Sequence, residues 1–528
     1  MQIMVGVYLY TKQKEMEYIS TANRSQLEFN CLEDLIEKEN PVRFIEAFVE
    51  KLDMKQLQFS IKELKEEGRP SFNPKLFLKL YLYGYLNGIR SSRRLEKESK
   101  RNIELHWLMG KLIPNYHSIA DFRKVNSLAL RNTFKLFVSF LKDADLISGK
   151  IVAVDGTKMR AHNSKKNNYS PKKIERHFKY IEEKTNEYLK ELDANDESES
   201  PIKLHDIAQK IESLKKNKIK YEVLAAKLDQ SRSPQISTTD ADARALLVQG
   251  QVVEVCYNMQ AAVDDKHKLV VATHTINRND RNALSAIAKE AKENLEVKEL
   301  TVLSDKGYHN SNELQTCKEE NITTICAQQE IVNSNEHGTT PDYLVTKFIY
   351  NKEGDTYTCP AGHTLKTTGT WHKKVSGNNT NLFKKYRTPA CKGCPVKHLC
   401  TGRVQGGREI DRGEFAEAVE ENSERYKANS KLYRTRQEIN EHIFGTIKRK
   451  WGYSYTNLKG LQKVNGEFAL IMTVYNMKRS MNILGMETIL EKIKNWKPDY
   501  KGMICANFKL TFFKAVRATI FQEQKLAA

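Results

Sequence analysis

The chain has 528 residues, and 40% of them are hydrophobic while 29% are charged, which is typical of folded globular proteins and excludes a disordered chain. Its 86 Lys and Arg against 66 Asp and Glu leave a net charge of +20. This excess favours a polyanionic partner, most simply nucleic acid, over the alternative of an ordinary soluble protein with a basic surface.

Residues 32–147 have the pattern of an all-helical region. Apolar residues recur at helical spacing between residues 76 and 89, after Asn73, which can cap a helix, and Pro74, which suits the first turn. The basic segment RSSRRLEKESKRN follows and predicts a second helix after a tight turn. Such a pair favours contact with DNA phosphates, although helical hairpins are common in proteins. Its candidate DNA-binding residues are Arg90, Arg93 and Arg94.

Two short β-branched runs end in a carboxylate. Residues 150–158 (KIVAVDGTK) predict a buried strand that ends at Asp155, and residues 298–310 (KELTVLSDKGYHN) predict another that ends at Asp305. Each aspartate alone is more often a turn or capping residue. On neighbouring strands, however, the two would repel unless a divalent cation neutralised them, and hard carboxylate oxygens suit Mg²⁺ or Mn²⁺.

Two further segments interrupt this strand-rich region. Residues 165–230 form two charged amphipathic patterns separated by NDESESP, which predicts an inserted helical hairpin. We interpret it as a solvated scaffold, with an arm that contacts DNA or a partner as the alternative. Residues 330–425 are rich in turns and contain four of the nine cysteines. The runs VVEVCYNMQAAVD and KLVVATHTI predict a β-hairpin, in which Asp264 is interpreted as a hairpin residue.

The cysteine spacing in the second insertion predicts a structural zinc site. Cys-x2-Cys in a Gly- and Pro-rich knuckle matches the usual zinc ligand pattern, and this many cysteines in one cluster favours a reducing compartment over a disulfide framework. The alternative is a set of reduced, buried thiols. The expected ligands are Cys359, Cys391, Cys394 and Cys400, with His363 or His398 as substitutes.

A third carboxylate is expected on the helix QEINEHIFGTIKRKWGY. Glu441 and Lys448 are seven residues apart, so in a regular helix they share one face, with Glu441 toward a metal and Lys448 toward phosphate. Glu438, one turn earlier, is the alternative. Taken in isolation, either glutamate could instead be a surface residue paired with Arg or Lys.

The chain resembles the DDE transposases of bacterial insertion sequences in the segments VDGT, SDKGY, YRTRQEINEHIFGTIKRKWGY and LKGLQKVNGEFALIMTVYNMKR. It also resembles the helical InsH-type N-terminal domain of transposases in GRPSFNPKLFLKLYLYGYLNGIRSSRRLEKESKRNIELHWLMG and PNYHSIADFRK. The resemblance runs in order from about residue 30 to residue 485. It implies an RNase H-like core with Asp155, Asp305 and Glu441 as the catalytic, metal-binding triad.

The family signature Tyr-x2-Arg-x3-Glu-x6-Lys is matched in part. Tyr433-x2-Arg436 is followed by four residues before Glu441, whereas Glu441-x6-Lys448 fits, so the role of Arg436 stays open. The resemblance also implies that STTDADAR orders the rim of the active site, against the alternative of a solvated turn. That segment contains Asp240, Asp242 and Arg244.

The implied chemistry uses two divalent ions, Mg²⁺ or Mn²⁺, about 4 Å apart. One activates water or a DNA 3′-hydroxyl, and the other stabilises the leaving 3′-oxygen, so one site can cut an element end and join it to a target. The expected phosphate contacts are Lys158, Arg436, Lys448 and Arg449. The aromatic residues Tyr308, Trp451 and Tyr453 either stack on a frayed base or pack in the core.

The predicted fold is an α/β catalytic core of RNase H-like type, a mixed sheet flanked by helices, with an all-helical N-terminal domain. At this length several domains are expected. They are a flexible N-terminus (1–30), a DNA-binding domain (31–148), a catalytic domain (149–485) with a helical-hairpin insertion (about 165–230) and a cysteine-containing β-rich insertion (about 330–425), and a basic tail (486–528).

The expected activity is that of a transposase acting on the double-stranded DNA of its element ends and of a target. Because two ends must be cut together, we expect a homodimer on DNA. The alternatives are a non-enzymatic or domesticated DNA-binding regulator, and a metal-dependent nuclease without strand transfer. The sequence contains neither 18 consecutive apolar residues nor a signal-peptide pattern, so we expect no membrane contact and a bacterial cytoplasmic, nucleoid-associated location.

Overall fold

The computed structural model describes residues 25, 29–61, 70–195, 201–231, 233–248, 252–328, 339–376 and 379–500. Most of the predicted flexible N-terminus and residues 501–528 of the predicted basic tail lie outside these ranges. Within them, no helix combines the length and the apolar character needed to cross a membrane.

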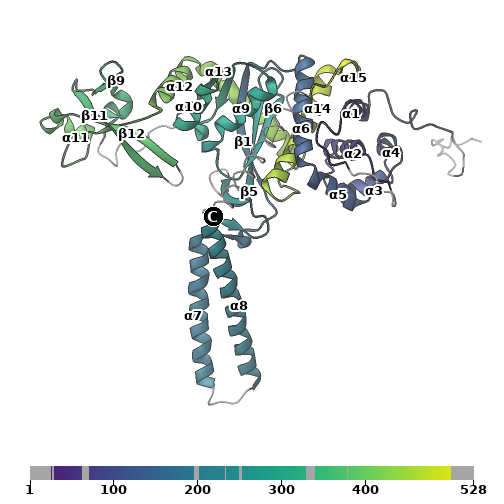
Figure 1. Cartoon of the computed structure of the whole chain (residues 1–528), viewed down its shortest axis with the longest axis horizontal. Helices are drawn as coiled ribbons and strands as arrows, with labels where there is room; N and C mark the ends of the chain where they lie inside the picture. Colours follow the sequence, from purple (N-terminus) through teal and green to yellow (C-terminus); the bar gives the residue numbers. More distant parts are fainter. Residues whose placement is uncertain are drawn as a thin grey trace, which may run out of the picture.

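The N-terminal region is helical and lies at one end of the elongated molecule (Figure 1). The predicted helix cap is confirmed, because the Asn73 side chain accepts a hydrogen bond from the backbone N–H of Lys75 at the start of α2. The helices bury phenylalanine and tyrosine rings against one another. They are α1 (Pro41–Glu50), α2 (Pro74–Leu86), α3 (Ser92–Ser99), α4 (Ile103–Met109), α5 (Tyr116–Val125) and α6 (Ser127–Asp143).

A six-stranded sheet forms the centre of the described chain, in the order β4-β5-β1-β7-β8, with β6 paired to β5. Strands β1, β7 and β8 are parallel, and β5 runs antiparallel to β1, β4 and β6. The predicted hairpin of β5 and β6 is thus confirmed. The strands are β1 (Ile151–Arg160), β4 (Arg244–Val248), β5 (Val252–Asp264), β6 (Val270–Ile276), β7 (Leu300–Ser304) and β8 (Ile322–Cys326).

Helices on both sides bury the sheet. The near-complete burial of α14 follows from its position between the sheet and α2 and α6 of the N-terminal region. At Gly466 a Cβ atom would lie 2.6 Å from the Ser127 backbone, so α14 and α6 approach closely because that residue has no side chain. The helices of this part are α9 (Leu284–Leu295), α10 (Ser311–Glu319), α12 (Ala416–Ala428), α13 (Ser430–Gly445), α14 (Leu461–Leu484) and α15 (Met486–Asn495).

Both predicted insertions form separate bodies (Figure 1). Helices α7 (Pro171–Asn195) and α8 (Pro201–Ser231) pack as a hairpin that projects from the core; the connecting residues 196–200 lie outside the described part. The second insertion is a five-stranded sheet, β13-β12-β11-β10-β9, with its own small core around Tyr357 and Tyr386. Its elements are β9 (Ile349–Asn351), β10 (Thr356–Thr358), β11 (Thr364–Ser376), β12 (Asn379–Arg387), α11 (Lys397–Cys400) and β13 (Ile410–Gly413).

Candidate functional site

Asp155 and Asp305 lie side by side on adjacent parallel strands. Val154 of β1 pairs with Ser304, the last residue of β7, so each aspartate is the next residue along its chain. The Asp305 carboxylate caps the turn η3 (Lys306–Tyr308) by accepting from the Gly307 N–H at 2.8 Å. Asp155 accepts from the Gly156 N–H at 2.7 Å. The predicted strand end is confirmed for Asp305.

For Asp155 the predicted strand end is wrong. Strand β1 continues past Asp155 to Arg160, because the long antiparallel strand β5 supplies paired partners over this whole stretch. The carboxylate nevertheless stands at an edge, since the neighbouring strand β7 stops one residue before it. The end of β7, and not a turn after Asp155, therefore opens the space beside this side chain.

Burial raises the pKa of Asp155 to about 6, and the negative charges of Asp305 and Asp280 act in the same direction, while the Gly156 N–H and the Arg436 charge oppose it. The ionised form is therefore costly in the protein without a cation. A divalent ion beside this carboxylate would offset that cost.

This pKa gives a pH-dependent expectation for metal-free protein. The pKa of Asp155 in the folded protein lies above its ordinary value of 3.8. The contribution of this carboxyl group to the free energy of unfolding is therefore fully present below about pH 4, and it is lost as the pH rises through about 6. Asp155→Asn should therefore become more stable relative to the native chain over this window, by up to about 3 kcal/mol. Thermal unfolding in EDTA at pH 4.5, 5.5 and 7.5 measures this; a stability difference that does not change with pH would contradict it.

Helix α13 contacts β1, and of its predicted site residues Arg436, but not Glu441, lies near Asp155. Arg436 is half-buried within electrostatic range of Asp155, and Asn440, one turn later, is buried with both side-chain polar atoms unpaired. Glu441 is exposed, and its carboxylate accepts a hydrogen bond from Gln437 at 2.7 Å. The alternative, Glu438, is also exposed, 3.9 Å from the Lys268 ammonium. The side chains as placed therefore bring together two of the three predicted carboxylates.

Metal ligands are likewise not preassembled in the described part of the chain. Across the described part of the chain, no three His, Cys, Asp or Glu side chains are gathered in a group that could hold a metal ion. Glu441 stays a proposal for the third ligand.

The helix that was predicted to carry both Glu441 and Lys448 on one face is not regular between them. Helix α13 ends at Gly445 and passes into a π-helical turn, Thr446–Lys450, which changes the rotation per residue. Lys448 is consequently half-buried, and burial lowers its pKa, with the nearby Lys158 charge acting in the same direction. Arg449 in the same turn is exposed. The turn thus directs Lys448 toward β1.

One of the three predicted DNA-binding arginines in the N-terminal region is unavailable to DNA. Arg90 is 7% exposed and donates to the backbone carbonyl of Tyr455 at 2.5 Å. It also pairs with buried Glu467 at 3.3 Å. The correction has a physical reason, because Arg90 lies where α14 packs on the N-terminal helices. Arg93 and Arg94 are exposed, and the Arg93 guanidinium lies over the Tyr116 ring.

The aromatic residues proposed to stack on a base are mostly core residues. Tyr308 and Tyr453 are fully buried, and Tyr453 donates to the Tyr85 carbonyl at 2.7 Å. Trp451 is half-buried against the core, 5.6 Å from Tyr453 between ring centroids. Base stacking is therefore wrong for Tyr308 and Tyr453.

The acidic residues near β4 and β5 hold neighbouring backbone segments in place through hydrogen bonds. Asp240 is buried and accepts from the Tyr257 hydroxyl at 2.7 Å and from the Gly460 N–H at 3.0 Å, and Asp242 accepts from the Leu461 N–H. They hold the start of α14, so the solvated-turn alternative fails for Asp240. Asp264 is more than a hairpin residue: it is fully buried and accepts from the Ser148 and Gly149 N–H groups, which lead into β1.

Sequence reasoning missed Asp280, which follows β6 in the turn η2 (Asp280–Asn282). Its carboxylate accepts from Asn258 and from Gln260 at 2.8 Å each, and it lies 3.9 Å from the Lys158 ammonium. The available signal was the polar run NRND directly after a predicted strand, which is the same context that drew attention to Asp305.

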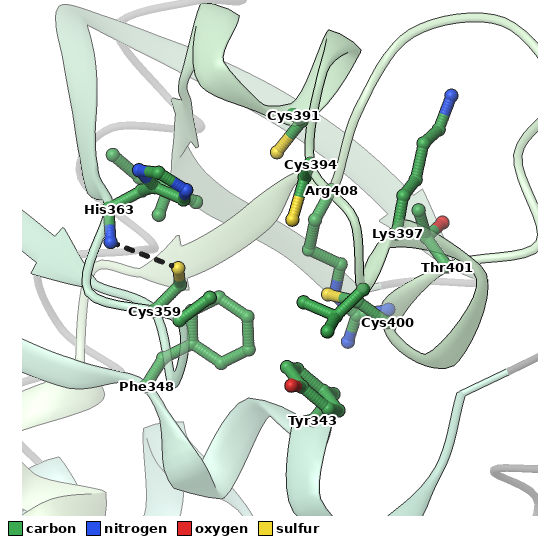
Figure 2. A pocket seen from close by; sticks show the side chains of 13 residues that line it. Tyr343, Phe348, Cys359, His363, Cys391, Cys394, Lys397, Cys400, Thr401 and Arg408 are labelled. Atoms are coloured by element: carbon green, nitrogen blue, oxygen red, sulfur yellow. Dashed lines mark hydrogen bonds between the residues drawn. The ribbon is translucent and has the colours of Figure 1, made fainter.

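The four predicted zinc ligands line one small cavity in the β-rich insertion, together with His363 (Figure 2). Cys359 accepts a hydrogen bond from the His363 N–H at 3.3 Å, and the sulfurs of Cys391, Cys394 and Cys400 point into the same space. His398 is exposed and does not line this cavity, so it is wrong as a substitute ligand.

Comparison with known proteins gives two family matches. Residues 30–125 match the family described as Transposase domain (DUF772), and residues 358–481 match the family described as Transposase DDE domain. The second match contains Glu441 and the cysteines, whereas Asp155 and Asp305 lie outside both. No curated protein and no solved structure matches the chain. Both matches are to transposase domains, and together they support an insertion-sequence DDE transposase.

Proposed function

We propose that this transposase binds the ends of its own insertion element, cleaves DNA strands there with divalent metal ions, and joins them to target DNA. The observation that carries the proposal is the pair of half-buried carboxylates, Asp155 and Asp305, on adjacent parallel strands. The strand order around them, with β5 antiparallel between β6 and β1, supports an RNase H-like core.

The residues present suit Mg²⁺ or Mn²⁺. Carboxylate oxygens are the ligands these ions prefer, and the buried Asn258 Oδ1, close to Gly156, is a further oxygen that has no hydrogen-bond partner. Asp155 and Asp305 would hold the ions, joined by Glu441 after its exposed side chain turns inward from α13. When bound, two such ions activate the attacking oxygen and stabilise the leaving one.

The DNA would lie along basic side chains on two parts of the molecule. Three basic side chains lie in this region: Arg436 is near Asp155, and Lys158 and Lys448 are near each other. They are placed to contact the phosphates next to the scissile bond. The exposed residues Arg93, Arg94 and Arg449 would contact phosphates farther away. Because an element has two ends, the working form would be a homodimer on double-stranded DNA, in the bacterial nucleoid.

The test is cleavage in vitro. The full chain should bind a double-stranded fragment carrying an inverted repeat that flanks its gene, and should nick it when Mg²⁺ or Mn²⁺ is added but not in EDTA. Binding without cleavage under all metal conditions would instead support the alternative of a DNA-binding regulator. Cleavage without joining to a target plasmid would support a metal-dependent nuclease.

We also propose one structural zinc ion in the β-rich insertion. The donors fit, because the thiols of Cys359, Cys391, Cys394 and Cys400 face one small cavity, and a backbone N–H already bonds to one of the sulfurs (Figure 2). The sulfurs would need to move closer to reach the distances of a zinc site. The ion would hold together an insertion whose own hydrophobic core is small.

Metal analysis of purified, reduced protein should therefore find about one zinc per chain. Cys391→Ser with Cys394→Ser should remove it and lower the unfolding temperature of the insertion. Cys31→Ser, which changes an exposed cysteine outside the cavity, is the matched control and should keep the zinc. Native protein prepared with reductant and without chelator that contains no zinc would exclude the site.

A further inference from the structure

A chain of hydrogen bonds crosses from the turn after β6 to the turn that contains Asp305. The Asp280 carboxylate accepts from the Gln260 amide at 2.8 Å, and the Gln260 carbonyl oxygen accepts from the Tyr308 hydroxyl. Tyr308 closes the turn begun by Asp305, since its N–H donates to the Asp305 carbonyl at 3.2 Å. Asp280 is thereby connected to the backbone of the Asp305 turn through two side chains.

One glycine, Gly156, leaves room for this connection, and a second, Gly307, lies in contact distance of it. At Gly156, directly after Asp155, a Cβ atom would lie 2.2 Å from the Gln260 amide nitrogen and 2.8 Å from an Asp280 carboxylate oxygen. At Gly307 a Cβ would lie 3.9 Å from the Asp280 Cβ. Asp280 therefore packs against the backbone next to both metal-binding aspartates.

The side chains that link Asp280 to the Asp305 turn are buried. Gln260 and Asn258 are fully buried, and Tyr308 is 1% exposed, so the hydrogen bonds between them are shielded from water. Asn258 adds a second bond to the same Asp280 oxygen, at 2.8 Å. Loss of the Asp280 acceptor would leave the Gln260 amide without this partner and the Asn258 amide with the Arg278 carbonyl alone, and a buried N–H without a partner is costly.

We infer that Asp280 is a positioning residue, which ties the Asp305 turn to strand β5 where Gln260 pairs with Gly156 of β1, and so sets the separation of the Asp155 and Asp305 carboxylates that would hold the metal. This inference rests on the proposed function. It assigns Asp280 a role through its hydrogen-bond acceptor and not through its charge or through direct metal contact.

The test measures Mn²⁺ binding by the full chain, from the electron paramagnetic resonance signal of free Mn²⁺. Asp280→Ala removes the acceptor and should weaken binding about 10-fold or more. Asp280→Asn keeps an acceptor oxygen and should bind within about twofold of native, while Tyr308→Phe, which removes one bond of the chain, should weaken binding in the alanine direction. Asp265→Ala is the matched control, since Asp265 is a half-buried aspartate in the turn after β5 and accepts a hydrogen bond from the Ser148 hydroxyl.

Native-like binding by both Asp280→Ala and Tyr308→Phe would overturn the inference. So would an Asp280→Asn variant that binds as weakly as the alanine variant, because that result would make Asp280 a metal ligand. If Asp280→Ala does not fold, Tyr308→Phe alone decides. Asp155→Asn distinguishes failure of this inference from failure of the proposed function. Weak Mn²⁺ binding by Asp155→Asn with native binding by the Asp280 and Tyr308 variants would overturn only the inference. Native binding by Asp155→Asn would overturn both the inference and the proposed function.

Discussion

Replacing Asp155 or Asp305 by asparagine is expected to lower metal-dependent cleavage of element ends by on the order of 10⁴-fold. Each substitution keeps the shape of the side chain but removes a charged oxygen next to its partner on the adjacent strand. Cleavage of a labelled end fragment in Mg²⁺ measures the effect. DNA binding should persist, because the exposed residues Arg93, Arg94 and Arg449 are unchanged.

Helix α13 provides a matched pair for the third ligand. Glu441→Gln should abolish cleavage to a similar extent, while Glu438→Gln, an equally exposed glutamate of the same helix, should retain it. The reverse result would move the third ligand to Glu438. Full activity in either aspartate variant would refute the proposed site.

Replacing Glu467 by alanine is expected to lower the free energy of unfolding by about 3–5 kcal/mol, more than the other substitutions named above. This residue of α14 is 1% exposed, pairs with Arg90 at 3.3 Å, and accepts from the Tyr85 hydroxyl and from the Asn457 and Leu458 N–H groups. Its removal leaves a buried guanidinium uncompensated where the N-terminal helices meet the core. Thermal unfolding should shift down by about 10 °C.

Two variants make this expectation specific. Glu487→Gln, on the exposed face of α15, should change the unfolding temperature very little. Arg90→Met with Glu467→Gln should recover part of the loss, because it removes one of the two buried guanidinium groups beside Glu467 and leaves only Arg123, which lies 3.9 Å from that carboxylate. An alanine variant at 467 that unfolds at the native temperature would contradict the structural role of this contact.

Local pattern predicted the elements near the site well. The cap at Asn73, the hairpin of β5 and β6, and the strand that ends before Asp305 are all confirmed, because each depends on neighbouring residues alone. The π-helical turn at Thr446–Lys450 was not predictable in this way. Helical spacing assumes a constant rotation per residue, and the π-helical turn departs from that rotation.

Local sequence pattern also failed to predict which side chains are buried. Arg90 lies in a basic segment and looks like a DNA contact, yet its partner Glu467 is 377 residues away in the chain. Tyr308 likewise lies three residues after Asp305, one of the proposed metal ligands, but its hydroxyl donates to Gln260 of β5. No spacing rule reports partners at that separation.

The sequence by itself determined the charge balance, the order of helical and strand-rich segments, the two insertions, and Asp155 and Asp305 as candidate carboxylates on two strands. Only the tertiary structure decided which side chains reach that pair: Arg436 and, through Gln260, Asp280, with Glu441 facing solvent. The physical reason is that strand and helix patterns follow from contacts a few residues apart. The surroundings of a site depend instead on how distant segments pack, which fixes the rotation of α13 and the approach of the turn after β6.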